Sequence, residues 1–129
     1  MKLLLDSNIL VPLTRDERTA LSAQVNFLLD ARSNDFFVST ASLWEIAIKT
    51  RLGKLDPSMP LPEIPGYFLQ LGYAVLNVDD RHAMEDLIDQ PNTRDPFDRM
   101  LLAQCQIEGL QLVTTDRVLK GHPLAWRPA

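Results

Sequence analysis

Short runs of consecutive apolar residues alternate along this chain with longer stretches in which apolar residues recur every three or four positions. Such runs are typical of buried β-strands, and such stretches indicate amphipathic helices. We expect strands at residues 3–5, 36–39, 74–78 and 110–114, with a final edge strand at 124–126. We expect helices at residues 9–13, from 19 or 22 to 32, 43–52, 63–71, 80–88 and 96–108.

The helix that starts at Pro96 has the clearest sequence signals. Proline suits a first helical turn, where no amide proton is needed, and Asp95 before it is a favourable cap. Gly109 is suited to the left-handed conformation that ends helices. Asp98 lies in the first turn, where it either complements the helix dipole or helps to hold a cation. The apolar stripe of this helix comprises Phe97, Leu101, Leu102, Cys105 and Ile107.

The alternation of strands and helices defines the expected fold class. Short parallel strands need crossover connections, and helices in those connections cover both faces of the sheet. We therefore expect a three-layer α/β/α domain with a mostly parallel sheet of four or five strands. The length of 129 residues suits a single domain spanning residues 1–129.

Composition narrows the class of protein further. The contents of 46% hydrophobic and 23% charged residues are those of an ordinary globular protein, and the net charge of −4 disfavours nucleic-acid binding by bulk electrostatics. The single cysteine, Cys105, is expected to be a buried, reduced thiol. The leucines at residues 3–5 are followed by Asp6, and this run is too short for a signal peptide or a membrane span. We expect a cytoplasmic protein that does not associate with membranes.

Four acidic residues are expected at one edge of the sheet. Asp6 follows the first strand, and Glu45 lies in the helix after the second. Asp98 opens the helix before the fourth strand, and Asp116 follows that strand. Each has a simpler explanation: Glu45 completes a Ser42-x-x-Glu45 capping box, Asp98 complements a helix dipole, and the other two are loop acids. Together, however, they would repel one another unless a cation shared the site, so the pattern implies a metal.

Oxygen ligands of this kind suit Mg²⁺ or Mn²⁺, and the two histidines, His82 and His122, are not spaced as zinc ligands. The chain also lacks a glycine-rich phosphate loop and a Gly-x-Ser-x-Gly elbow. Hydrolysis of a phosphodiester with one or two carboxylate-held ions fits these residues best.

Four segments resemble the PIN-domain ribonucleases, and in particular the VapC-type toxins of bacterial type II toxin–antitoxin systems. They are residues 4–8 (LLDSN), 42–49 (SLWEIAIK), 94–104 (RDPFDRMLLAQ) and 113–116 (VTTD). The resemblance runs nearly from end to end, and the second and third segments are its most specific parts. It implies a PIN-like fold and a metal-dependent endoribonuclease that inhibits translation.

The resemblance also implies roles for individual residues. The acids that would bind metal and carry catalysis are Asp6, Glu45, Asp98 and Asp116, with Asn8 and Thr115 in support. Asp95 is then a helix cap. Thr93 and the Ser7-Asn8 pair depart from the family pattern, which bears on substrate choice and efficiency rather than on the class of reaction.

The implied partners are an RNA substrate, with transfer RNA as one candidate, a VapB-type antitoxin and a second copy of the chain. A basic rim would bind the RNA backbone, unless these side chains form an ordinary solvated surface. The rim comprises Lys49, Arg51, Lys54, Arg94, Arg99, Arg117 and Lys120. Trp44, Tyr67 and Phe68 are expected mainly in the core, although some of them would suit a dimer or antitoxin groove.

The sequence is also compatible with two functions other than ribonuclease activity. One is a PIN-fold module that has lost catalysis and binds RNA or protein. It is disfavoured by the presence of all four acids. The other is a phosphoryl-transfer site in which Asp6 becomes phosphorylated. The residue two positions after Asp6 is Asn8 rather than the aspartate of phosphatase signatures, and no receiver-type lysine is evident.

Overall fold

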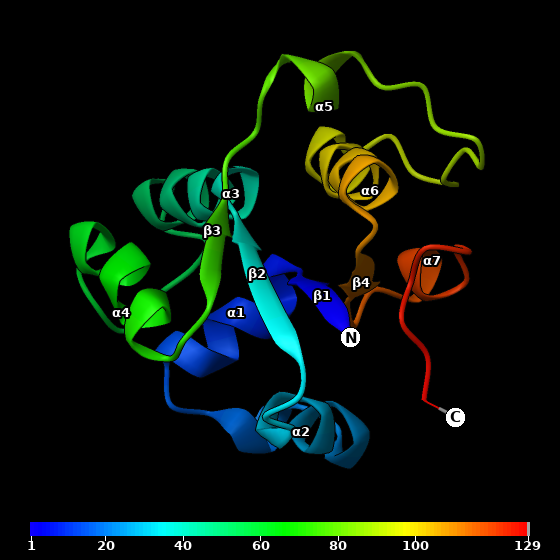
Figure 1. Ribbon diagram of the computed structural model, residues 1–129. Helices are drawn as coiled ribbons and strands as arrows, with labels where there is room; N and C mark the ends of the chain where they lie inside the picture. Colours follow the sequence, from blue (N-terminus) through cyan, green and yellow to red (C-terminus); the bar gives the residue numbers. More distant parts are fainter. Residues whose placement is uncertain (129) are drawn as a thin grey trace.

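A parallel β-sheet lies at the centre of the computed structural model, which describes residues 1–128 (Figure 1). Within these residues the sheet has four strands in the order β3-β2-β1-β4, and all neighbouring strands run parallel. The strands are β1 (Lys2–Leu5), β2 (Asp35–Ser39), β3 (Ala74–Leu76) and β4 (Gln111–Val113). β1 pairs with both β2 and β4, so it is a central strand of the sheet.

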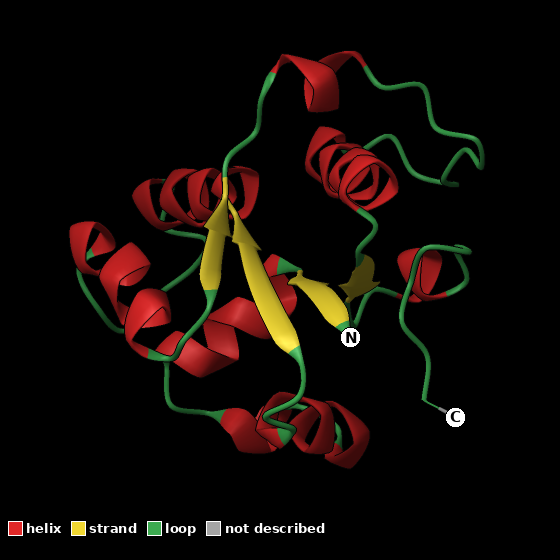
Figure 2. Ribbon diagram, in the orientation of Figure 1, coloured by secondary structure: helices red, strands yellow, loops and turns green. Residues whose placement is uncertain are grey.

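Helices cover both faces of the sheet, so the expected three-layer α/β/α fold is confirmed (Figure 2). Side chains of α1, α2 and α4 form one apolar cluster, and those of α6 and α7 contribute to a second cluster on the opposite face. The helices are α1 (Ser7–Thr14), α2 (Ala23–Asp30), α3 (Thr40–Arg51), α4 (Ile64–Gln70), α5 (Asp80–Met84), α6 (Pro96–Glu108) and α7 (Arg117–Lys120). Two short 3₁₀ turns lie at Arg18–Ala20 and Leu61–Glu63.

The leucines of β1 explain why this strand reads as a continuous apolar run. Leu3 and Leu5 belong to the first cluster, whereas Leu4 belongs to the second, and all three have no exposed surface. Successive side chains of a strand point to opposite faces, so a strand covered by helices on both sides must be apolar at every position. Cys105 of α6 is likewise a buried free cysteine, as expected.

Several boundaries differ from the expected ones. Helix α1 begins at Ser7 because the Asp6 side chain accepts a hydrogen bond from the Ser7 amide and caps it. Helix α5 ends at Met84, because Glu85 takes an extended conformation and Leu87 packs into the second cluster from a loop. Helix α7 was not expected, and its cap is Asp116.

The expected edge strand at residues 124–126 is not a strand. The chain there makes one isolated parallel bridge, between Ala125 and Leu112 of β4. Two hydrogen bonds flank the bridge: the Leu112 amide donates to the Leu124 carbonyl at 2.9 Å, and the Trp126 amide donates to the Leu112 carbonyl at 2.8 Å. The proline at position 123 and the turn before it leave too little extended chain for a longer ladder.

The order of the strands determines where a ligand site can form. From β1 the chain passes to β2 and β3 on one side, whereas β4 lies on the other side of β1. The connections therefore diverge at the carboxyl ends of β1 and β4, which is where open parallel sheets bind ligands. Along residues 1–128, no helix combines the length and apolar character that a membrane crossing requires.

Candidate acidic site

Asp6 lies at the centre of the candidate site, directly after β1 and beside the end of β4. Its amide donates to the Val113 carbonyl at 3.0 Å, which extends the β1–β4 pairing by one step. Its carboxylate caps α1 through the Ser7 amide, at 2.7 Å from Oδ1. The residue is only 4% exposed, so the sheet itself holds this carboxylate in a buried position.

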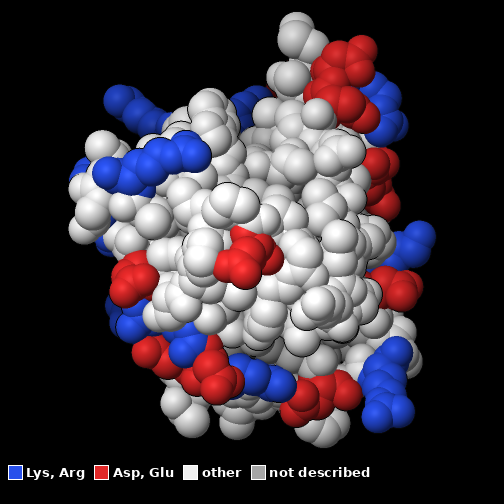
Figure 3. Space-filling model, turned by 90° about the vertical axis from the view of Figure 1, so that its left-hand side faces the viewer, with Lys and Arg blue, Asp and Glu red and all other residues white. Residues whose placement is uncertain are grey.

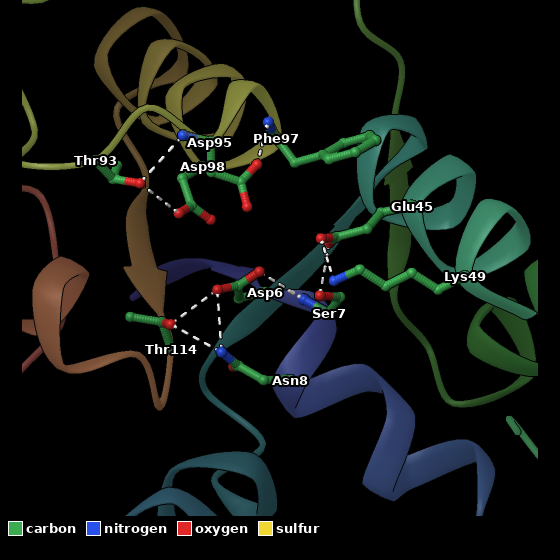
Figure 4. A network of polar contacts seen from close by, with 10 residues as sticks. All are labelled: Asp6, Ser7, Asn8, Glu45, Lys49, Thr93, Asp95, Phe97, Asp98 and Thr114. Carbon is green, nitrogen blue, oxygen red and sulfur yellow. Dashed lines mark hydrogen bonds and ion pairs between the residues drawn. The ribbon is translucent and has the colours of Figure 1, made fainter. Parts of the chain in front are cut away.

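Two side chains donate hydrogen bonds to the other oxygen of Asp6. Thr114 Oγ1 donates to Oδ2 at 2.8 Å, and Asn8 Nδ2 donates to it at 3.3 Å (Figure 4). Burial raises the pKa of Asp6 above its usual value, and the charges of Glu45 and Asp116 raise it further. The bonds from Thr114 and Ser7 oppose this shift because they stabilise the ionised form.

Thr114 joins the two strand ends. Besides binding Asp6, its hydroxyl accepts hydrogen bonds from Asn8 Nδ2 at 3.2 Å and from the Asp116 amide at 3.0 Å. Thr115, which we expected as the polar neighbour, has an exposed side chain, and its amide donates to Asn8 Oδ1 at 3.1 Å. Because Leu5 pairs with Val113, the next step of this register places Thr114 beside Asp6. Sequence reasoning missed Thr114 because the register is not visible in the sequence.

Glu45 reaches the site from the second turn of α3. The simpler explanation of Glu45 as part of a Ser42 capping box is wrong, because Ser39 is the cap of α3 and Ser42 lies inside the helix. Glu45 is 5% exposed, and both of its carboxylate oxygens accept hydrogen bonds. Ser7 Oγ donates to Oε1 at 2.7 Å, and Lys49 Nζ donates to Oε2 at 2.9 Å. The bond to Glu45 raises the pKa of Lys49, so this ammonium stays charged.

Asp98 approaches from the first turn of α6. Asp95 caps this helix, as expected, by accepting a hydrogen bond from the Phe97 amide at 2.8 Å. Among residues 1–128, the only hydrogen bond to the Asp98 carboxylate is a long one, from Thr93 Oγ1 to Oδ2 at 3.4 Å. Partial burial and the charges of neighbouring acids, Asp95 and Asp6 foremost, raise its pKa to about 7. Burial and repulsion among the acids together therefore outweigh the favourable helix dipole at this position.

The four expected acids influence one another electrostatically, and Figure 4 shows the carboxylates of Asp6, Glu45 and Asp98 facing a shared space. Within residues 1–128, no three His, Cys, Asp or Glu side chains lie close enough to form a ready metal-binding group. The donor set nevertheless fits a hard divalent cation, because it is made of carboxylate oxygens and because Asp98 is partly buried beside other acids, both of which raise its pKa.

The cations of the expected basic rim lie on several helices and in the loops between them. The side chains of Arg51, Arg94, Arg99 and Arg117 are exposed, and Arg99 Nη1 donates to Gln90 Oε1 at 2.6 Å. Lys49 differs from these arginines because it is paired with Glu45.

The three aromatic residues expected in the core divide between core and surface. Phe68 is fully buried and Tyr67 is half-buried, but Trp44 is 63% exposed, so its assignment to the core is wrong. Trp44 makes an edge contact with Phe97, with ring centroids 5.9 Å apart. The two rings line an apolar pocket of about 370 Å³, whose other lining residues also come mainly from α3 and α6.

Comparison with known proteins identifies the family. The sequence model of the PIN domain matches residues 3–122. The chain belongs to the PIN-domain family. Among relatives of this PIN domain, Ribonuclease VapC16 of Mycobacterium tuberculosis is 44% identical over 50 residues, which cover 38% of this chain and 36% of that protein.

A solved structure supports the fold of this PIN domain over nearly its whole length. It is the crystal structure of VapBC2 from Rickettsia felis bound to a DNA fragment from their promoter. The TM-score is 0.62, with 16% sequence identity over 97% of this chain and 96% of that chain. At this level of identity the likeness concerns the fold alone.

We expect Thr114→Val to lower the free energy of unfolding by about 2 kcal/mol. The substitution keeps the shape of the side chain but removes the hydroxyl that binds buried Asp6, and hydrogen bonds to charged groups are worth about 1.5–3 kcal/mol. Urea unfolding at pH 7 measures the change. Thr115→Val is the matched control, and because that side chain is exposed we expect a change within about 0.5 kcal/mol. Equal effects of the two substitutions would contradict the assigned role of Thr114.

We expect Asp98→Asn to stabilise the metal-free protein at alkaline pH. Folding raises the pKa of Asp98 to about 7, so the folded protein favours the protonated carboxyl group. The stability that this protonation contributes is complete below the unfolded pKa of about 4 and is lost as pH rises through 7. Asparagine cannot ionise, so the variant avoids this loss. Solvent screening limits the gain to about 1 kcal/mol, or roughly 3 °C in Tm.

Thermal unfolding in chelator between pH 4.5 and 8.5 tests this prediction. The difference in Tm between Asp98→Asn and the unsubstituted protein should grow with pH. Asp86→Asn, at an exposed acid in the loop after α5, provides a control for the loss of one negative charge. A constant difference across this pH range would show that Asp98 titrates equally in the folded and unfolded protein.

Proposed function

We propose that this PIN domain is a metal-dependent endoribonuclease that hydrolyses RNA phosphodiester bonds as the toxin of a toxin–antitoxin pair. The observation that carries the proposal is the convergence of carboxylates around buried Asp6 at the carboxyl ends of β1 and β4. The name of its relative, Ribonuclease VapC16, supports the same activity.

Asp6 and Asp98 would hold the principal ion, Mg²⁺ or Mn²⁺, and Glu45 and Asp116 would complete or adjust the site. Such an ion, when bound, lowers the pKa of water and neutralises charge on a phosphate. Asp6 is well placed to anchor it because three donors fix the carboxylate before any ligand arrives. Asp98 has one weak donor, so its oxygens are the more available for an ion.

The polar residues around the acids would act as positioning residues. Asn8 and Thr114 hold Asp6 and tie α1 to the end of β4. The amide of Thr115 in turn holds the Asn8 side chain. Thr93 occupies the position next to Asp98, where its hydroxyl donates to the carboxylate and also accepts from the Asp95 amide at 3.2 Å. A loss of any of these contacts would misplace a carboxylate without removing it.

The exposed cations would bind the RNA backbone. Arg94, Arg99 and Arg117 lie in or next to the segments that carry Asp98 and Asp116, so phosphates that they bind would pass near the acids. Arg51, at the end of α3, would extend this rim beyond Glu45. A few phosphate contacts of this kind provide affinity without sequence preference, and they account for RNA binding by a chain of net charge −4.

As a toxin, the protein would have an antitoxin of VapB type as its partner. It would act in the cytoplasm on RNA that supports translation, such as transfer RNA. This assignment is supported by the name VapC16 and by the likeness of the fold to a chain of the VapBC2 assembly. To inhibit cleavage, the antitoxin would have to cover the acidic site or the apolar pocket that Trp44 and Phe97 line.

A homodimer is the expected form of the toxin, and one face of the molecule is suited to it. The face that carries α4 is largely uncharged in Figure 3, although acidic atoms lie near its middle and basic atoms lie across its upper left part. Large apolar side chains are exposed on α3 and around the end of α4: Trp44, Leu52, Leu69 and Leu71. Burying them against another chain would be favourable, since apolar surface contributes about 25 cal/mol per Å² removed from water.

We expect the purified protein to cleave RNA only when a divalent ion and Asp98 are both present. The test incubates a mixed RNA pool, transfer RNAs included, with Mg²⁺, with Mn²⁺ or with chelator, and maps the cut ends. Asp98→Asn should reduce cleavage at least about 100-fold, because it removes a charge from the ion-binding set. Asp86→Asn is the charge control and should cleave normally.

The outcomes separate the proposal from its alternative. Cleavage that survives chelator, or that Asp98→Asn leaves unchanged, would overturn the metal assignment. A folded, antitoxin-free protein that cuts no RNA in the pool under any condition would contradict the nuclease and favour a PIN-fold module that only binds RNA or protein.

A further inference from the structure

Lys49 is the one cation that forms an ion pair with any of the four site acids within residues 1–128. Its ammonium lies 2.9 Å from Glu45 Oε2, and its charge also acts on Asp95 and Asp6. Figure 4 shows the side chain running from α3 toward Ser7, along the side of the shared space between the carboxylates. A positive charge therefore already lies at the edge of the proposed ion site.

The contacts of Glu45 show which of its partners can leave. Ser7 Oγ, which binds Oε1, belongs to a short side chain in the capped first turn of α1, so it cannot move far. Lys49, which binds Oε2, has a side chain that is 46% exposed and a flexible four-carbon stem. Glu45 itself is nearly buried, with 7% of its side chain exposed. Lys49 can swing into solvent, whereas Glu45 and Ser7 are held in place.

We propose that Lys49 is a tethered counter-ion of the acidic site, which competes with the divalent ion for Glu45 and is released when that ion binds. Before loading, the ammonium offsets part of the repulsion among the acids and keeps Glu45 aimed inward. After loading, repulsion between the two cations and the loss of its partner oxygen drive Lys49 toward solvent. The released ammonium then becomes available to an RNA phosphate at the mouth of the site. This inference rests on the proposed function, because it needs the acids to bind a divalent ion.

An ordinary surface ion pair four residues apart on a helix makes a different prediction. Such a pair contributes a few tenths of a kcal/mol to the helix and has no effect on a separate ligand. Competition instead requires that removing Lys49 strengthens binding of the divalent ion. The two explanations therefore predict different changes in metal affinity.

The experiment measures Mn²⁺ and Mg²⁺ affinity by isothermal titration calorimetry on full-length, chelator-treated protein. We expect Lys49→Met to bind these ions about tenfold more tightly, which corresponds to about 1.4 kcal/mol. Lys49→Arg keeps a competing charge and should remain close to the unsubstituted protein. Arg51→Met removes one positive charge from the same helix, at a side chain that makes no ion pair in the described part of the chain, and should leave metal affinity unchanged.

Thermal unfolding provides a second readout that does not depend on activity. Lys49→Met should have a lower Tm than the unsubstituted protein in chelator, because the acids lose their counter-ion. With saturating Mg²⁺ the two Tm values should converge, because the ion pair between Lys49 and Glu45 is then absent from both proteins. A purely structural ion pair would lower the Tm equally with and without Mg²⁺.

Each outcome has a distinct meaning. Unchanged or weaker ion binding by Lys49→Met, while Asp98→Asn abolishes binding, would overturn the role of Lys49 and leave the metal site of the proposed function intact. Absence of ion binding in the unsubstituted protein and in Lys49→Met alike would overturn both. If Lys49→Met and Arg51→Met strengthened ion binding equally, the effect would come from the change in net charge alone. That result would also overturn the proposal.

Discussion

The constraint on which the site depends is the burial of a carboxylate at the junction of two parallel strands. Asp6 is almost inaccessible to water, and burial alone would favour its neutral form. The chain offsets this cost with the capping bond from α1 and with the hydroxyl of Thr114. These donors bind the ionised form, and they come from elements that the sheet itself brings together. The fold and the charge state of the site are therefore determined by the same contacts.

The other acids are stabilised less fully. Glu45 has two good donors, Asp116 caps a helix, and Asp98 has one long hydrogen bond. Asp98 is therefore the carboxyl group with the least compensation, and burial together with the charges of the neighbouring acids raises its pKa to about 7. A site that were fully satisfied by its own donors would have little affinity for a ligand of opposite charge. The hydrogen-bond donors therefore hold Asp6 rigidly, whereas the oxygens of Asp98 stay available to a cation.

The sequence predicts the layers of this fold and the residues that surround its site, but not the contacts within the site. Alternating apolar runs and helical stripes suffice for the sheet, and the Asp95-Pro96 signal places the start of α6 correctly. The role of Thr114 depends on which residue of β4 pairs with Leu5, and the exposure of Trp44 depends on how α3 packs beside α6. Both are properties of packing between distant segments. The capping motif at Ser42 failed for a related reason: Ser39 is followed directly by helix, so α3 begins earlier.

The bond between Thr114 and Asp6 joins residues 108 positions apart. Contacts of such long range form late, because a large loop must close before they contribute to stability. Synthesis on the ribosome delivers Asp6 well before Thr114, because 108 positions separate the two residues. Until β4 emerges, β1 lacks its second neighbour and the first carboxylate lacks its strongest side-chain donor. A nascent chain therefore cannot assemble this site until β4 has left the ribosome.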